Sequence, residues 1–92
     1  MRKSFQVSIL SAEAKIYDGP AVSLTVPAGL GEMGIWADHM PYLTILTPGR
    51  IVLKKSEEEA PVVYKAVGKG ICDILKSRVT LLLDQVDTVK TS

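Results

Sequence analysis

Five prolines punctuate this chain of 92 residues so regularly that no long helix fits between most of them; they are Pro20, Pro27, Pro41, Pro48 and Pro61. Proline lacks a backbone N–H and its ring clashes with the preceding helical turn, so helices do not run through it. The chain has the length of one domain, and a domain of this size can bury a hydrophobic core. The spacing therefore favours short strands in a single domain.

Between the prolines, apolar residues recur with the period of two that is typical of a half-buried strand, as in Phe5–Ile9 and Val22–Val26. Further apolar runs are too short for helices of about ten or more residues. These runs are Tyr42–Leu46, Ile51–Leu53, Val62–Val67, Ile71–Leu75 and Val79–Leu83. Turn-forming sequences separate the runs, namely Asp18-Gly19-Pro20, Pro48-Gly49, Gly68-Lys69-Gly70 and Lys76-Ser77-Arg78. We predict an all-β fold, either a sandwich or a flattened barrel.

Charge and residue usage exclude several classes of site. Eleven Lys and Arg against ten Asp and Glu leave a net charge of +1, so there is no strong electrostatic footprint for nucleic acid. The single cysteine, Cys72, excludes an intrachain disulfide or multi-cysteine zinc site, and the single histidine, His39, excludes paired-histidine metal motifs. No apolar run approaches the roughly 20 residues of a bilayer span, and the N-terminus lacks the apolar core of a signal peptide. We expect a soluble, cytosolic-type protein without a cofactor.

Residues 29–34 read Gly-Leu-Gly-Glu-Met-Gly and match the glycine pattern of dinucleotide-binding loops. That pattern binds pyrophosphate because its last glycine opens a helix whose N-terminus faces the phosphates. Here Pro41 and a strand-like continuation follow, and the chain has no second βαβ unit. We interpret residues 29–34 as a glycine-rich turn and expect no nucleotide there.

The sequence assembles no catalytic group either. Asp38 and His39 are sequence neighbours, but adjacent residues on an extended chain point to opposite sides, and a general base also needs a nucleophile and a pocket. We predict a turn aspartate and a surface or interface histidine. Cys72, beside Ile71 in an apolar run, is expected to be buried and unreactive. Glu57–Glu59 are expected in a solvated hairpin loop.

One segment rich in turn residues is unusually apolar and leaves two interpretations open. Its large side chains are Met33, Ile35, Trp36, Met40 and Tyr42. They either cap one end of the core or form an exposed patch, since Trp, Tyr and Met are enriched at protein interfaces.

The same segment, from Gly31 to Thr44 and on to Thr47-Pro48-Gly49, resembles the epsilon subunit of F-type ATP synthases. The run Gly-Glu-Met-Gly-Ile-Trp-Ala-Asp-His-Met-Pro-Tyr-Leu-Thr is similar to the central motif of that family, and the resemblance covers about residues 5–86. Flanking similarities are weaker and lie at Ser11–Glu13, Tyr17–Gly19 and Val79–Leu83. The sequence departs from the family pattern at Ala37, Met40, Tyr42 and Gly68-Lys69-Gly70.

The resemblance implies a flattened sandwich of about ten short strands over residues 1–86, followed by a polar tail at residues 87–92. It implies a non-catalytic subunit at the foot of the rotary central stalk of a proton-translocating ATP synthase. Such a subunit binds the gamma subunit, touches the polar loops of the c-ring and couples rotation to ATP synthesis. Its place is peripheral, on the cytoplasmic face of the bacterial inner membrane. Nothing after Asp84 resembles the helical hairpin that most members carry.

The resemblance also implies two sets of contact residues. The gamma contact is expected at Ser11, His39, Met40, Tyr42 and Thr44. The c-ring contact is expected at Gly31, Glu32 and Met33. The competing interpretation is a free-standing β-sandwich that binds a small ligand or peptide in a concave, apolar pocket.

Overall fold

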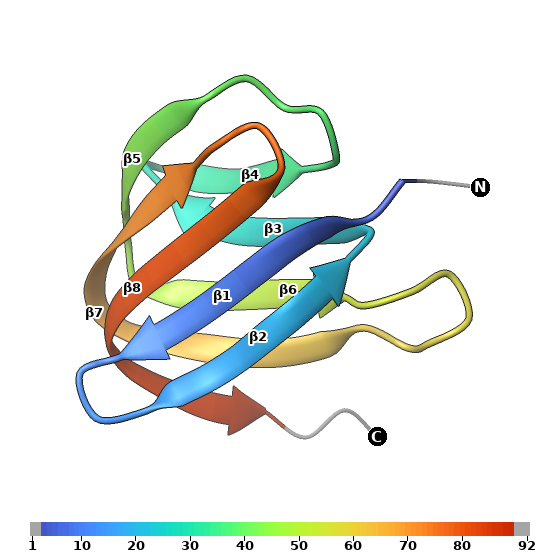
Figure 1. The fold of residues 1–92 in the computed structure, drawn as a ribbon. Helices are drawn as coiled ribbons and strands as arrows, with labels where there is room; N and C mark the ends of the chain where they lie inside the picture. The colour runs from blue at the N-terminus through green and yellow to red at the C-terminus, as the bar shows by residue number, and fades with distance from the viewer. Residues whose placement is uncertain (1–2, 90–92) are drawn as a thin grey trace.

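In the computed structural model, which describes residues 3–89, the chain forms eight β-strands and, within that range, no helix (Figure 1). The strands are β1 (Phe5–Ser11), β2 (Lys15–Ala21), β3 (Ser23–Ala28), β4 (Gly31–Ile35), β5 (Tyr42–Leu46), β6 (Gly49–Lys54), β7 (Val62–Ile74) and β8 (Arg78–Val89). The prediction of an all-β fold is confirmed.

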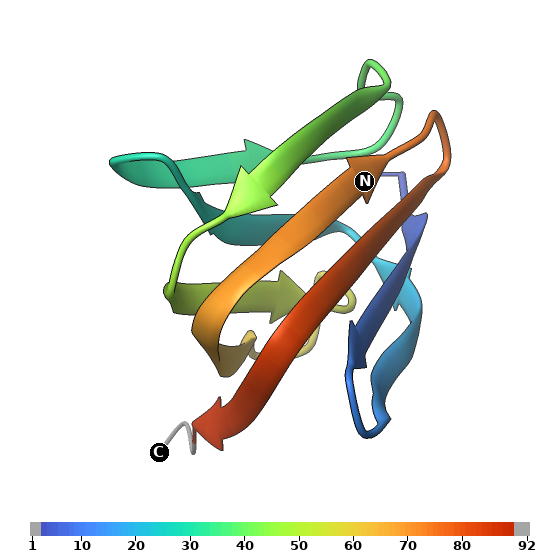
Figure 2. The same ribbon diagram turned by 90° about the vertical axis from the view of Figure 1, so that its left-hand side faces the viewer.

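Two long strands, β7 and β8, connect the two layers of the sandwich (Figure 2). In one layer the order is β2-β1-β8-β7-β5, and β1 runs parallel to β8. In the other layer β4, β3 and β6 lie beside the first half of β7 and the last part of β8. The structure has eight strands where the resemblance implied about ten, and β7 and β8 are long because each runs through both layers.

The bend that takes β7 from one layer to the other lies at Gly68-Lys69-Gly70, where its pairing with β8 shifts register. Gly68 has a φ of +82°, a backbone conformation that residues other than glycine rarely adopt. A Cβ on Gly70 would lie 2.6 Å from the backbone oxygen of Leu82. The expectation that this sequence separates two strands is wrong, because the two glycines form a bulge that bends one continuous strand.

Two further turn predictions are corrected, because strands occupy the residues concerned. Asp18-Gly19-Pro20 lies inside β2, which within the described part of the chain is an edge strand paired only with β1, and proline is tolerated on such a strand. The turn expected over residues 29–34 reduces to Gly29-Leu30, and Gly31 already pairs with Ala28 as the first residue of β4. Gly29 has a φ of +60°, as the first position of a II′ hairpin turn requires.

The core fills the space between the layers, and its fully buried large side chains include Ile9, Leu24, Leu46, Ile51 and Leu81. Cys72 is fully buried, as expected, and Glu57–Glu59 are exposed in the loop between β6 and β7. β8 continues to Val89, so the polar tail expected from residue 87 begins inside a strand. Residues 90–92 of that tail lie outside the described part of the chain.

Candidate partner-binding surfaces

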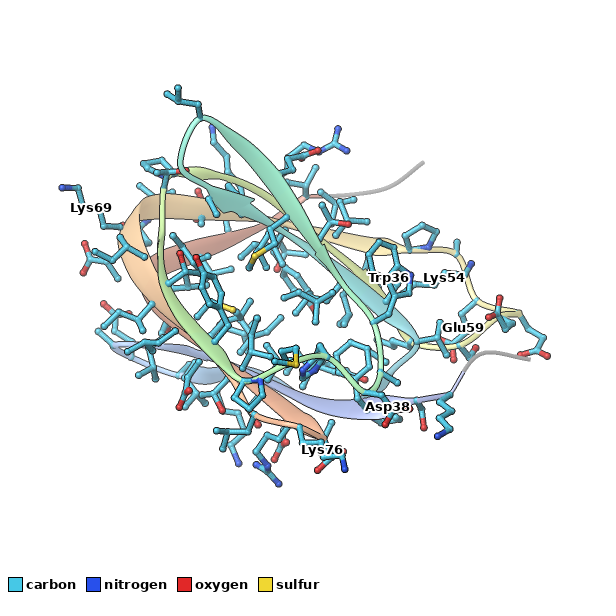
Figure 3. All side chains as sticks on the ribbon, turned by 90° about the horizontal axis from the view of Figure 1, so that it is seen from above. Trp36, Asp38, Lys54, Glu59, Lys69 and Lys76 are labelled. Carbon is cyan, nitrogen blue, oxygen red and sulfur yellow. The ribbon has the colours of Figure 1, made fainter. Side chains whose placement is uncertain are left out.

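The sandwich opens between β4 and β5. Among residues 3–89, β4 pairs only with β3, and β5 meets β3 at a single bridge between Leu46 and Ala28. The open edges leave a hollow of about 350 Å³, which we call the seam; Figure 3 looks down on this side of the molecule, with Trp36 and Asp38 on the β4–β5 connection. The seam is lined by Met33, Gly34, Ile35, Trp36, Ala37, His39, Met40, Tyr42 and Ile74.

Both interpretations of the apolar segment hold, each for part of it. Ile35 is buried and Met33 packs against the core, so these two side chains cap it. Trp36, Met40 and Tyr42 are 53%, 82% and 56% exposed, respectively. The outer part of the seam is therefore an exposed patch made of the residue types that protein interfaces favour.

The neighbouring side chains of Asp38 and His39 make separate contacts. His39 packs its ring edge-on against Phe5 with centroids 5.5 Å apart, and both ring nitrogens are buried without a hydrogen-bond partner among residues 3–89. The imidazole is half-buried at the floor of the seam, so of the two predicted settings the surface does not apply and the interface stays a prediction. Asp38 is exposed in the turn, as predicted, and accepts a hydrogen bond from Lys3 Nζ at 2.9 Å, which lowers the pKa of its carboxyl.

Ser11, expected on the gamma-facing surface, lies away from the seam. It stands at the end of β1 opposite to Phe5, so about 20 Å of extended chain separates it from the residue that contacts His39. Its hydroxyl accepts hydrogen bonds from the backbone N–H groups of Glu13 and Ala14 and orders the turn into β2. The structure therefore does not gather the five expected gamma contacts on one patch.

β5 presents different residues to its two sides. Tyr42 pairs with Ile74 and Thr44 with Cys72, so these side chains share the inner face of the layer. Leu43 and Ile45 consequently point outward, and they are 66% and 64% exposed. Neither residue was predicted as a contact, because an apolar run without alternation does not indicate which of its side chains are buried.

The β3–β4 hairpin carries the expected c-ring contacts at the end of β4 that lies away from the β4–β5 connection. Gly31 and Glu32 are exposed, whereas Met33 turns inward and packs against the core. Leu30, at the tip of the hairpin, is fully exposed and was not predicted as a contact. Its exposure could have been predicted from the sequence, because a leucine between two glycines in a two-residue loop does not reach the core.

The described residues include no group of three or more His, Cys, Asp or Glu side chains placed to hold a metal ion. Asp18 is held structurally, because its Oδ1 accepts hydrogen bonds from Gln6 Nε2 at 3.1 Å and Ser8 Oγ at 3.0 Å. These bonds, with a smaller contribution from Lys15, lower the pKa of the Asp18 carboxyl. Residues 3–89 contain no helix that is long and apolar enough to cross a bilayer.

These features define a small β-sandwich domain whose exposed apolar residues and projecting hairpin are suited to contact other proteins. The family model for the ATP synthase Delta/Epsilon chain, beta-sandwich domain, matches residues 4–88, and the chain belongs to this family. The resemblance noted in the sequence is confirmed at the level of the family.

Two bacterial relatives illustrate the match. The ATP synthase epsilon chain of Nitrosospira multiformis is 44% identical over 80 residues, which are 87% of this chain and 56% of that protein. The epsilon chain of Dichelobacter nodosus is 34% identical over 85 residues, which are 92% of this chain and 58% of that protein. The chain thus spans a little over half the length of these relatives.

Solved structures share the fold at low identity. A chain in the mitochondrial ATP synthase OSCP/F1/c-ring assembly of Euglena gracilis superposes with a TM-score of 0.83 at 18% identity, over 92% of this chain and 53% of that one. A chain in the central stalk/c-ring of the Tetrahymena thermophila mitochondrial enzyme gives 0.75 at 11% identity, over 95% and 68%.

Proposed function

We propose that this chain is a non-catalytic rotor subunit of a proton-translocating F-type ATP synthase, which links the gamma subunit to the c-ring and couples rotation to ATP synthesis. The family match over residues 4–88 carries the proposal. The assemblies that contain its structural neighbours, one with the c-ring and one comprising central stalk and c-ring, support it. The site of action is the cytoplasmic face of the bacterial inner membrane, as a peripheral part of the complex.

The gamma contact is proposed at the seam. Met40 and Tyr42 offer exposed apolar area there, and His39 packs beneath them. Thr44 lies further along the inner side of β5, and Ser11 takes part only if gamma reaches about 20 Å along the molecule. If gamma binds this chain through Tyr42 and Met40, truncation of the Tyr42 ring should remove most of the affinity.

The c-ring contact is proposed at the hairpin tip, through Gly31, Glu32 and the adjoining Met33. Glu32 is exposed, so an ion pair with a basic loop residue contributes only about 0–1 kcal/mol and weakens with salt. Glu32 therefore sets orientation more than affinity. Met33 is partly buried and packs against the core, so it contributes to the contact chiefly by holding the base of the hairpin in place.

Binding of this chain to the gamma subunit of the same organism, measured by calorimetry, tests the proposal directly. We expect saturable binding. A stable monomer that does not bind gamma but binds a small ligand in the seam would instead favour the interpretation as a free-standing binding module. For the c-ring arm, Glu32→Lys should weaken proton pumping of the reconstituted complex at low ionic strength while gamma binding stays intact. Glu58→Lys, the same charge change in the β6–β7 loop, is the matched control and should leave pumping unchanged.

A further inference from the structure

The connection between β4 and β5, residues 36–41, has open space on both sides. Its residues Trp36, Ala37, His39 and Met40 border the seam. Trp36 and Ala37 also line a second hollow of about 250 Å³, together with Asp38 and residues outside the connection. A segment with few packed neighbours on either side can change position at little cost, while the strands that it joins stay paired.

The imidazole of His39 is buried in this connection without its hydrogen bonds. Its ring contacts Phe5 edge-on, and both ring nitrogens are buried without a partner among residues 3–89. A neutral imidazole has one N–H donor and one acceptor nitrogen, and burial of either group without a partner costs free energy. Ring packing therefore holds His39 in place against the requirements of its nitrogens.

Among residues 3–89, one side-chain hydrogen bond ties the connection to the rest of the chain. Lys3 Nζ donates it to Asp38 Oδ2 at 2.9 Å, and the two side chains are 75% and 58% exposed. An ion pair so open to water contributes little. Asp38 also has a φ of +61°, which is uncommon for residues other than glycine. The observed position of residues 36–41 is therefore only weakly favoured.

The charged groups around the imidazole decide how a proton on it would act. Within residues 3–89 they are Asp38 on the connection, Lys3 on the N-terminal segment and Lys76 on the β7–β8 turn. The hydrogen bond from Lys3, with a smaller effect from the charge of Lys76, lowers the pKa of the Asp38 carboxyl. Figure 3 shows Asp38 and Lys76 at the rim of the molecule. The side chains of β4, β5 and β7 that line the seam carry no charge between pH 5 and pH 8; they are Met33, Ile35, Tyr42 and Ile74.

A protonated His39 does not suit this position. The imidazolium has two N–H donors, and neither ring nitrogen has an acceptor among the described residues. Burial of a charged group without hydrogen bonds is more costly than burial of the neutral ring. In water both N–H groups would find acceptors, so protonation favours a position in which the ring has left the floor of the seam.

We infer that residues 36–41 are a pH-dependent latch beside the seam, closed while His39 is neutral and open when its imidazole is protonated. Histidine is the side chain whose charge ordinarily changes between pH 5 and pH 8. Because the open form binds one proton more, the ratio of open to closed chains rises by up to about tenfold for each unit by which the pH falls. The latch is a property of the chain itself and does not depend on the proposed function.

One tryptophan and one histidine make the latch directly observable in the 92-residue chain. The Trp36 ring lies against Gly34, so its fluorescence follows the connection, and the imidazole proton signals in an NMR spectrum follow the charge of His39. From pH 8 to pH 5 we expect Trp36 emission to move to longer wavelength and its quenching by acrylamide to rise. Both changes should share the midpoint of the His39 titration. Far-ultraviolet circular dichroism should stay constant, because the strands remain paired.

Three variants separate the latch from other effects of acid. His39→Gln gains no proton in this range, so its Trp36 signals should stay constant. Lys3→Gln removes the tie to Asp38, so the latch should open at a slightly higher pH than in the wild type. Lys69→Gln is the matched control, because it removes the same charge at the bend of β7, on the other side of the view in Figure 3, and should leave the midpoint unchanged.

Several results would overturn the inference. Titration of His39 with constant Trp36 signals would show that its protonation does not move the connection, and constant signals from both residues would show that the latch stays closed. An unchanged Trp36 transition in His39→Gln would assign it to another group. Loss of circular dichroism together with the Trp36 change would identify unfolding of the domain. If His39→Gln does not fold, the two wild-type midpoints still decide, since different midpoints exclude the coupling.

Discussion

At the scale of single residues, burial in the core determines the reactivity of the Cys72 thiol. Its thiol is fully buried, and this burial, with a smaller effect from the charge of Asp73, raises its pKa to about 12. A thiol with so high a pKa holds almost no thiolate near neutral pH, so it neither attacks electrophiles nor binds metal. Tyr17 and Tyr64 also have pKa values raised mainly by burial.

The raised pKa of Cys72 predicts a loss of stability at alkaline pH. The folded state keeps the proton up to about pH 12, whereas the unfolded chain releases it near pH 9, so rising pH favours unfolding across this window. The largest slope is about 1.4 kcal/mol per pH unit. Urea unfolding of wild type and Cys72→Ala, compared from about pH 8 to pH 10, should show a steeper decline in wild type, because the tyrosines contribute equally to both chains and only near the upper end of this range. Parallel curves would contradict it.

Tyr42 is the second residue whose environment makes a definite prediction. Its ring is 56% exposed at the open end of β5, so Tyr42→Ala should change Tm little. If the ring is a seam anchor, the same variant should weaken gamma binding by about 1–2 kcal/mol. A fall in Tm with unchanged affinity of the folded fraction would instead assign Tyr42 to the core. Met40→Ala is the comparison variant for both measurements, because Met40 is a neighbouring side chain that is more exposed and more flexible than Tyr42.

At the scale of elements, the bend in β7 is the feature on which the two-layer arrangement depends. Gly70→Ala would place a Cβ 2.6 Å from the Leu82 backbone oxygen, which cannot move without separating β7 from β8. We expect a loss of about 2–3 kcal/mol in the free energy of unfolding. Gly31→Ala is the matched control, because nothing lies within 4 Å of its added Cβ. Urea denaturation of both variants measures the difference, and equal stabilities would mean that the bend tolerates a side chain.

Strand identity was predictable from the sequence wherever local pattern decides it. The period of two identified the strand beginning at Phe5, and the apolar runs located most of β5 to β8. β2 was missed because Asp18-Gly19-Pro20 has the composition of a turn, and only its position at a sheet edge makes it a strand. β4 was missed because Gly31 and Gly34 have the composition of a turn, whereas Gly34 lies inside the strand and packs closely against Trp36.

The candidate site was less predictable, because contacts between distant strands define it. His39 was found as the only histidine, but its packing on Phe5 depends on a contact 34 positions away in sequence. The exposed apolar row on the outer face cannot be recognised from the sequence, since Leu10, Ile45, Ile71 and Leu82 become neighbours only through the register of four strands. Non-local register of this kind follows from the assembled sheet and not from any one segment.

At the scale of the whole molecule, β8 joins the two layers into one unit. Residues 78–83 pair with β1 and the second half of β7, whereas residues 85–89 pair with the first half of β7. Val86, in this last part, packs against the core. Within residues 3–89, neither layer of the sandwich is therefore complete without β8.

This dependence predicts the outcome of shortening the chain. With a chain ending at Val89 as reference, a chain ending at Leu83 loses the partners of Val63, Tyr64 and Ala66 and uncovers one side of the core. Val86 is partly buried, so removal of its side chain costs less than the roughly 1.5–3 kcal/mol of a fully buried valine, and the lost strand pairing adds to this cost. A chain ending at Val86 keeps that side chain and should lie between the two. Thermal unfolding followed by circular dichroism ranks the three; equal Tm values for the chains ending at Leu83 and Val89 would mean that the second layer is complete without β8.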